Sequence, residues 1–379
     1  MIYFDNAATT PVLDKCIEIV EKYNTQCFFN PSARYFPAVD VHKKVSEARE
    51  VLANSINSSV SEIFYTSSGS ESDNWAIKGI MRKPNGRLIV SEAEHPAVYN
   101  TALYLKNNGY DVEFCKVLSD GRVDEQHLKS LLKEDTKLVS IMHVNNETGA
   151  INNIEKLVSI VKSNTRALFH SDGVQAFGKI SVDVESLGVD MYSMSAHKIH
   201  APKGVGALFI KKGVNIQPLI HGGGQENGYR SSTENVSGIL AFSEAIKQSE
   251  NYLRQRSTEI FALRRYIADK LVDEYGDDVL INTDLENSTP YILNLSIKGV
   301  RGEVLLHRLE SDNIFISTGS ACSSKKGVSR LVKALNIPDE YSEGTIRISF
   351  SRFSKMAEGE EFIQKVIPHI NQLMRFRRK

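Results

Sequence analysis

The feature that most constrains the fold of this 379-residue chain is an alternation of short apolar segments with helical patterns between residues 60 and 210. Strands are expected at residues 63–66, 87–91, 111–115, 138–143, 166–171, 191–194 and 206–210. Helices are expected at residues 72–81, 96–107, 125–132 and 154–163. This alternation is typical of an α/β domain with a mostly parallel sheet and helices on both of its faces.

The chain is too long for one small core, and its last third predicts a second unit. Residues 235–275 are expected to form a charged helical bridge to that unit. Strands then follow at residues 291–296, 314–317 and 345–350, with helices at residues 302–310 and 358–375. We therefore predict a large domain at residues 15–255 and a smaller α+β domain made of residues 1–14 and 256–379.

Composition excludes several classes of protein. The 46 basic and 46 acidic residues give no net charge, so neither nucleic acid nor a membrane surface is the expected partner. No apolar stretch approaches the length of a membrane span, and no secretory signal precedes the first strand. The four cysteines are scattered without a close pair, so no metal site or disulfide framework is expected. A reducing, cytoplasmic setting is the expectation.

Lys198 ends the segment 191–198, in which an apolar run gives way to small polar residues. We expect it at the carboxyl end of a buried strand, where α/β sheets build their sites. A lysine with the ordinary pKa of about 10.4 is a weak nucleophile at neutral pH. Burial or a neighbouring cation lowers that pKa and permits a Schiff base with a carbonyl. By itself, Lys198 could equally be a solvated lysine after a strand.

Two further patterns fit a phosphorylated, aromatic ligand. Asp172 follows an apolar run, and a carboxylate there can pair with the pyridine nitrogen of pyridoxal phosphate (PLP), although it could instead cap a helix. Gly69 and Ser70 lie in a small-residue turn between a strand and a helix, where free amides bind phosphate. An ordinary serine-rich turn is the alternative. Ser195 and His197 are placed to reach the same anion.

Three more polar residues follow expected strand ends. His95 could stack on a flat cofactor ring and shuttle protons. Asn146 and Gln175 could donate hydrogen bonds to a ring oxygen. Each of the three, taken singly, could also be an ordinary surface or loop residue.

The C-terminal third contributes a thiol and a guanidinium. Cys322 lies in a small, polar segment, where Lys325 and Lys326 would favour the reactive thiolate. An incidental surface cysteine is the alternative. Arg347 projects from an apolar strand, and it would pair either with a substrate carboxylate or with an acidic side chain of the protein.

Specific motifs extend over nearly the whole chain, from Tyr3 to Arg347. They are the segments 71–74 (ESDN), 142–147 (MHVNNE), 197–198 (HK), 221–224 (HGGG) and 319–322 (GSAC). By these motifs the chain resembles the cysteine desulfurases of the NifS/IscS type, in the class V aminotransferase group. The resemblance implies the fold of PLP-dependent transferases of fold type I, with PLP as the cofactor.

The resemblance also assigns roles to individual residues. Those that would hold the PLP ring are Lys198, which forms the Schiff base, and Asp172, Asn146, Gln175 and His95. Those that would hold the phosphate are Gly69, Ser70, Ser195, His197 and, from the other subunit of a homodimer, Thr233. Those that would hold the substrate carboxylate are Asn30 and Arg347.

The implied reaction converts L-cysteine into L-alanine. Lys198 takes the α-proton, the Cys322 thiolate attacks the substrate sulfur, and the resulting persulfide passes to a sulfur-acceptor protein. That acceptor is expected to be an iron–sulfur scaffold or a tRNA-thiolation enzyme. Because the chain ends soon after Leu373, the extension that docks the scaffold in IscS-type members is expected to be missing. A selenocysteine lyase, another class V PLP enzyme or a non-catalytic scaffold on this fold are the alternatives.

Overall fold

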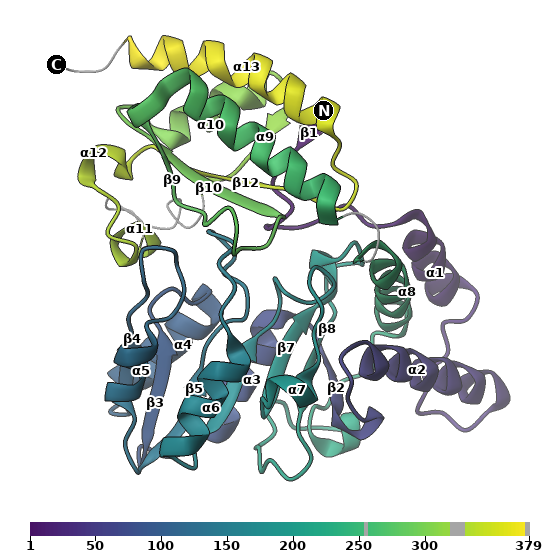
Figure 1. Cartoon of the computed structure of the whole chain (residues 1–379). Coiled ribbons are helices and arrows are strands. Elements are labelled where there is room, and N and C mark those ends of the chain that lie inside the picture. The colour runs from purple at the N-terminus through teal and green to yellow at the C-terminus, as the bar shows by residue number, and fades with distance from the viewer. Residues whose placement is uncertain (254–256, 319–329, 376–379) are drawn as a thin grey trace.

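The computed structural model describes the chain except for residues 254–256, 319–329 and 376–379 (Figure 1). Its main body is a seven-stranded sheet with the order β2-β8-β7-β6-β5-β3-β4. Its strands are β2 (Ile63–Thr66), β3 (Arg87–Ser91), β4 (Asp111–Cys115), β5 (Thr136–Ser140), β6 (Leu168–Asp172), β7 (Met191–Ser195) and β8 (Gly206–Ile210). Strand β8 runs opposite to its neighbours β2 and β7, and the remaining neighbours are parallel. The predicted mostly parallel sheet is confirmed.

The sequence predicted four of these strands with their observed bounds and misplaced the ends of the other three. The largest difference is at β5, which ends at Ser140, whereas the sequence predicted a strand to residue 143. The chain continues in hydrogen-bonded contact beyond the strand, since the amides of Ile141 and His143 donate to the carbonyls of His170 and Asp172. The apolar pattern therefore outlasts the regular ladder, because these residues already belong to the loops at the sheet edge.

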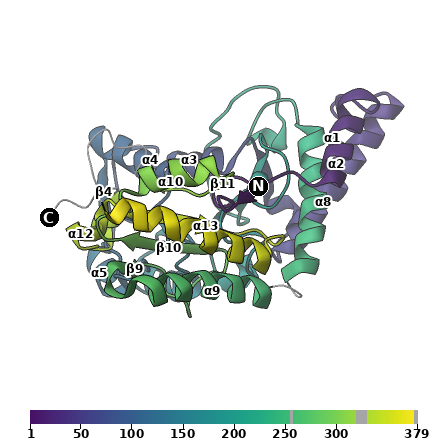
Figure 2. The ribbon, with the colours of Figure 1, turned by 90° about the horizontal axis from the view of Figure 1, so that it is seen from above.

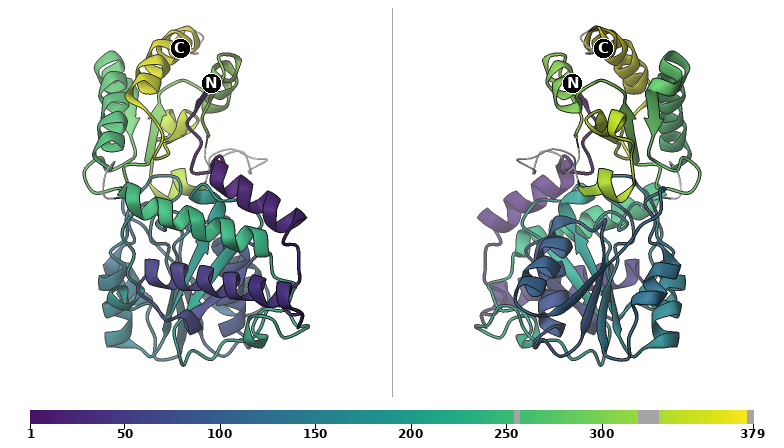
Figure 3. Two further views of the ribbon diagram at one scale, coloured as in Figure 1. Left: turned by 90° about the vertical axis from the view of Figure 1, so that its right-hand side faces the viewer. Right: turned by 90° about the vertical axis from the view of Figure 1, so that its left-hand side faces the viewer.

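Helices cover both faces of the large sheet (Figure 3). One face packs on α3 (Gly69–Ile80) and α4 (Pro96–Asn107), around Trp75 and Leu88. The other packs on α2 (Phe36–Ser55), α5 (Glu125–Leu131), α6 (Ile154–Asn164), α7 (Val184–Leu187) and α8 (Val236–Leu253), around Leu52, Phe169 and Phe242. Helix α1 (Asp14–Thr25) lies against α8. Among the described residues, no helix combines the length and apolar character needed to cross a membrane.

Helix α3 begins three residues earlier than the sequence predicted, because the side chain of Ser68 caps it by accepting a hydrogen bond from the Glu71 amide. The prediction for α4 matches its bounds, and those for α5 and α6 differ by one residue. The expected helical bridge is two helices, α8 and α9 (Ser257–Tyr275), on either side of the undescribed residues 254–256.

A second, smaller unit stands at the top of Figure 1. Its three-stranded antiparallel sheet consists of β9 (Val279–Ile281), β10 (Ile292–Ile297) and β12 (Thr345–Ser349) in the order β12-β10-β9. Strands β1 (Ile2–Tyr3) and β11 (Ile314–Phe315) form a parallel pair beside it. Helix α13 (Met356–Met374) lies between α9 and α10 (Gly302–Ser311), as Figure 2 shows. The short helices are α11 (Arg330–Ala334) and α12 (Asp339–Ser342).

The smaller unit has its own apolar core, to which the N-terminus contributes. Phe4 packs edge-on against Phe350 and Phe362, and Ile2 is buried in the same cluster. The first residues of the chain thus pack with the C-terminal third. This separate core supports the division into residues 15–255 and residues 1–14 with 256–379, which stays a prediction.

Candidate active site

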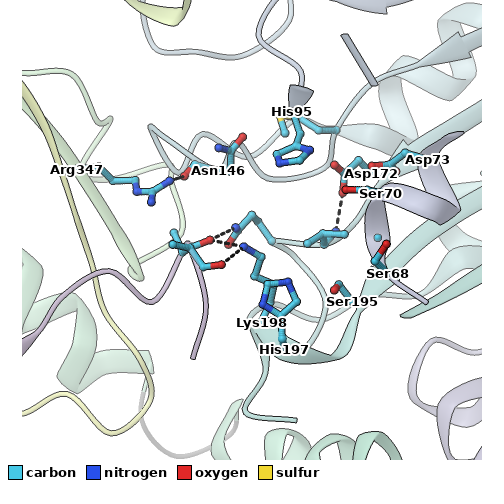
Figure 4. A pocket seen from close by; sticks show the side chains of 16 residues that line it. Ser68, Ser70, Asp73, His95, Asn146, Asp172, Ser195, His197, Lys198 and Arg347 are labelled. Carbon is cyan, nitrogen blue, oxygen red and sulfur yellow. Dashed lines mark hydrogen bonds between the residues drawn. The ribbon is translucent and has the colours of Figure 1, made fainter. Parts of the chain in front are cut away.

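Residues that follow five strands of the large sheet line one cavity of about 320 Å³, which we call the strand-end cavity (Figure 4). It also receives Arg347 from β12 of the smaller unit. The wall residues that the sequence had singled out are Gly69, Ser70, His95, Asn146, Asp172, Gln175, Ser195, His197, Lys198 and Arg347. Their convergence follows from the topology, because parallel strands place their carboxyl ends at one edge of a sheet.

Lys198 lies directly after β7, in the 3-10 turn η2 (Ala196–Lys198). Its Nζ donates hydrogen bonds to the backbone carbonyls of Ala7 and Ala8, both at 2.6 Å. Burial, followed by the nearby positive charge of Arg347, lowers the pKa of Lys198 to about 8. More neutral amine is therefore present at neutral pH than in an ordinary lysine, and neutral amine is the nucleophilic form.

Asp172 is the last residue of β6 and is only 4% exposed. Its Oδ1 accepts a hydrogen bond from the Val174 amide at 2.9 Å. Burial raises the pKa of Asp172 to about 6, and the hydrogen bond from Val174 and the charge of Lys198 oppose that rise. Turns rather than a helix follow Asp172, so the helix-cap alternative does not hold. A buried carboxylate of this kind fits a protonated ring nitrogen, which would balance its charge.

The turn between β2 and α3 forms another wall of the cavity. Gly69 and Ser70 are the first two residues of α3, so their amides have no partner inside the helix. A Cβ at Gly69 would lie 2.5 Å from Cγ2 of Val174, so no side chain fits there. The hydroxyl of Ser195 is buried and finds no hydrogen-bond partner among the described residues. Free helix amides beside an unpaired hydroxyl fit the phosphate group of PLP.

Two histidines of the cavity are held in the neutral form. His95 precedes α4, and its Nδ1 accepts a hydrogen bond from the Ala97 amide at 3.1 Å, which leaves the ring proton on Nε2. Burial, and then nearby cations beginning with Lys198, lower its pKa to about 4. Nδ1 of His197 lies 3.1 Å from Oγ1 of Thr9, and burial followed by the charge of Lys198 lowers its pKa to about 4. His95 can therefore lie against a cofactor ring without adding charge.

The amide of Gln175 has a fixed orientation. Its Oε1 accepts a hydrogen bond from Nζ of Lys179 at 2.7 Å, and its Nε2 donates to the Ala7 carbonyl at 2.9 Å. Because a lysine can only donate, the oxygen must face Lys179 and the amide hydrogens must face away from it. Gln175 thus offers the donor that a ring oxygen requires. Asn146 lines the cavity as well.

Arg347 is already paired in this structure. Its Nη2 donates to Oδ1 of Asp5 at 2.7 Å, and its Nη1 donates to the Asn146 carbonyl at 2.9 Å. Its Nε has no acceptor in the part of the chain that the structure describes. The salt-bridge alternative is therefore present, and a carboxylate in the cavity would meet an arginine that Asp5 already orients.

Two predicted residues, Asn30 and Thr233, are not brought to the cavity, and a third cannot be placed. Asn30 is exposed, and its Oδ1 accepts a hydrogen bond from the Ser32 amide at 3.0 Å. Thr233 is also exposed and lies outside the cavity wall. Cys322 lies outside the described residues. The roles assigned to these three residues stay predictions.

Several groups that line or surround the cavity were not predicted from the sequence. Asp73 is buried on α3, and it offers a ligand atom within 4.8 Å of one from His95 and one from Asp172. Its position one helical turn after Gly69 could have indicated this, because residues four apart share a helix face. Ala7 and Ala8 contribute only backbone carbonyls, for which the sequence carries no signal.

Comparison with known proteins agrees with this geometry. The family model described as aminotransferase class-V matches residues 2–362. A cysteine desulfurase IscS of Clostridium botulinum is 37% identical over 97% of this chain and 94% of its own length. Another, from Dictyoglomus turgidum, is 39% identical over 93% of this chain and 90% of its own. The solved structure of a NifS-like protein superimposes with a TM-score of 0.92 at 36% identity, covering 98% of this chain and 99% of that one.

The chain belongs to the class-V aminotransferase family, whose members depend on PLP, and the cavity offers the groups that PLP needs. Within that family it groups with the cysteine desulfurases of the NifS/IscS type. The resemblance read from the motifs is confirmed.

Proposed function

We propose that this protein is a PLP-dependent cysteine desulfurase, which converts L-cysteine into L-alanine and passes the sulfur to an acceptor protein. The observation that carries the proposal is the convergence of Lys198, Asp172 and the Gly69 turn in one cavity, in a chain related throughout to cysteine desulfurases. A related structure, of SspA in complex with cysteine, has 31% identity and a TM-score of 0.82, and it covers 93% of this chain and all of that one.

The proposed cofactor contacts follow from the wall of the cavity. PLP, when bound, withdraws electron density from the α-carbon of the substrate. Asp172 would hold the ring nitrogen in its protonated form, and His95 would cover one ring face. Gln175 and Asn146 would donate to the ring oxygen. The phosphate would be held by Gly69, Ser70, Ser195 and His197.

The chain's own residues then move protons and sulfur. Nζ of Lys198, with its lowered pKa, would remove the α-proton of L-cysteine. Sγ of Cys322, as thiolate, would attack the substrate sulfur, so that one S–S bond forms while the substrate C–S bond breaks. The former sulfur-bearing carbon takes up a proton and leaves as the methyl group of alanine. Arg347 would contact the substrate carboxylate.

We propose that two copies of the chain form a dimer that completes each site. An exposed apolar patch supports this proposal, because such patches mark interfaces. The patch consists of Phe28, Tyr35, Phe36 and Val39, of which Phe36 is 85% exposed. Phe36→Glu should convert a dimer into a monomer in light scattering, whereas Val272→Glu, on the exposed face of α9, should not. An unchanged mass for Phe36→Glu would remove the patch from the interface.

The experiment that tests the activity measures alanine release from L-cysteine and from L-selenocysteine by the holoenzyme, with and without an acceptor. We expect L-cysteine to be used and an acceptor to accelerate turnover. Iron–sulfur scaffold and tRNA-thiolation proteins are the acceptors to compare. Release from L-selenocysteine alone would instead identify a selenocysteine lyase.

The sulfur-carrying role of Cys322 has its own test. Cys322→Ala should abolish transfer of labelled sulfur to a protein acceptor, because none of the described cysteines, Cys16, Cys27 and Cys115, lines the strand-end cavity. Cys27→Ala, at the matched control position outside the cavity, should transfer sulfur normally. Persistent transfer by Cys322→Ala would remove the proposed role.

A further inference from the structure

Behind Asp172 lies a buried layer of polar side chains that the proposed reaction does not use. Asp73 on α3 is 1% exposed, and His170 and Ser193 are fully buried. His170 is fixed from both sides, since its Nδ1 lies 2.8 Å from Oγ of Ser140 and its Nε2 lies 2.9 Å from Oγ of Ser193. Figure 4 shows Asp73 beside Asp172, at the end of the cavity away from Arg347.

Two buried carboxyl groups therefore lie side by side. Asp73 and Asp172 each offer a carboxylate oxygen, the two oxygens lie within 4.8 Å of one another, and Oδ1 of Asp73 has no hydrogen-bond partner among the described residues. Two ionised carboxylates only accept hydrogen bonds, so a bond between them requires a proton on one of the two. Like charges at this distance also disfavour double ionisation in a buried site.

The surroundings decide which carboxyl keeps the proton. Burial, and then the negative charge of Asp172, raise the pKa of Asp73 well above its ordinary value. Nε2 of His170 lies 3.7 Å from Oδ1 of Asp73, and burial lowers the pKa of that histidine to about 3. Asp172, in contrast, receives the Val174 amide and lies near Lys198. The proton therefore belongs on Asp73 and the charge on Asp172.

We propose that Asp73 is a positioning residue that, as a neutral carboxylic acid, donates a hydrogen bond to Asp172 and keeps that carboxylate ionised and aimed at the cofactor ring nitrogen. The proposal rests on the proposed PLP site and adds a residue to it. It assigns a purpose to a buried acid that forms no salt bridge with any lysine or arginine in the part of the chain that the structure describes.

Three full-length variants, purified as holoenzymes, test the proposal. Asp73→Asn keeps a neutral donor of the same shape, whereas Asp73→Leu removes it. We expect Asp73→Asn to stay within about threefold of the wild type in kcat. Asp73→Leu should lose about tenfold to a hundredfold in kcat, the range expected for a hydrogen bond to a charged group, with little change in KM for L-cysteine. Thermal unfolding shows whether each variant is folded.

The second readout is independent of turnover. Without its donor, Asp172 is easier to protonate, so in Asp73→Leu the pH at which the visible absorbance of bound PLP changes should move upward by about one unit. PLP should also dissociate faster from this variant. If Asp73→Leu does not fold, Asp73→Ser, which is too short to reach Asp172, replaces it.

Two results would overturn the proposal. One is an Asp73→Asn variant as impaired as Asp73→Leu, which would require a charged Asp73. The other is an Asp73→Leu variant that matches the wild type in absorbance and kcat. Asp172→Asn is the reference, and we expect severe loss of both. If Asp172→Asn were also normal, the proposed PLP site itself would fail, rather than the role of Asp73 alone.

Discussion

Lys198 and Lys179 are both buried near the strand-end cavity, and they differ in the groups that surround the amine nitrogen. Burial lowers the pKa of Lys198 to about 8 and that of Lys179 to about 7. Lys198 lines the cavity and is held by two backbone carbonyls. Lys179 lies behind Gln175, to whose side-chain oxygen it donates, and it is not part of the cavity wall.

The difference teaches that a lowered pKa does not by itself select the reactive amine. Judged by pKa alone, Lys179 would be the better nucleophile at neutral pH. Its Nζ donates to the side-chain oxygen of Gln175, and we infer that it orients this amide. Lys198 is the amine that a ligand in the cavity can reach, and access therefore outweighs the lower pKa of Lys179.

The largest effect expected from this comparison comes from Lys198→Met. Loss of the amine that takes the α-proton should lower the rate of alanine formation by about a thousandfold or more. Lys203→Met, an exposed lysine close by in the sequence, is the matched control and should behave like the wild type. Substantial activity in Lys198→Met would show that another base acts.

The pH dependence of cofactor uptake gives a second effect. Since the pKa of Lys198 is lowered to about 8, its amine is mostly protonated below that pH and mostly neutral above it. The rate at which apoenzyme takes up PLP should rise about tenfold per pH unit up to pH 8 and then level off. A rate that already levels off near pH 7 would point to Lys179, whose pKa is about 7.

Lys179→Met should have a smaller effect on activity. Without its lysine the Gln175 amide can rotate, which should weaken PLP binding and lower kcat by about tenfold or less. The pH dependence of stability gives a further test, because the direction of the change can be predicted. The folded-state pKa of Lys179 lies below its ordinary value, so its burial destabilises the protein most near pH 7 and least near pH 10.5.

The Tm of Lys179→Met relative to the wild type should therefore be higher at pH 7 than at pH 10. Differential scanning calorimetry of both proteins at the two pH values measures it. A constant difference in Tm across this range would mean that Lys179 is not buried as the structure has it.

The fold, and the part of the site that is formed by strand ends, were predictable because the residues concerned follow a local sequence pattern. Asp172, Ser195 and Lys198 each stand where an apolar run ends, and a parallel sheet brings such positions together. The site residues that come from one sheet were therefore recognisable one strand at a time. The local pattern predicts these positions, and the resemblance to the NifS/IscS type assigned their roles.

The rest depends on contacts between distant segments, which a local pattern does not carry. Asp5 meets Arg347, 342 residues away in the sequence, and Ala7 meets Lys198 through a backbone carbonyl. Asp73 resembles any polar residue in the first turns of a helix, and only packing brings it beside Asp172. The apolar pattern after β5 likewise hides the strand end, because the loop beyond it is also buried.

The most direct test of this account identifies the lysine that binds PLP. The holoenzyme is treated with borohydride, which makes the lysine–PLP linkage permanent, and is then digested and analysed by mass spectrometry. We predict that the added mass lies on Lys198 and that Lys179 is unmodified. Label on Lys179, or no label on either lysine, would contradict the central claim that the strand-end cavity places Lys198 as the reactive amine.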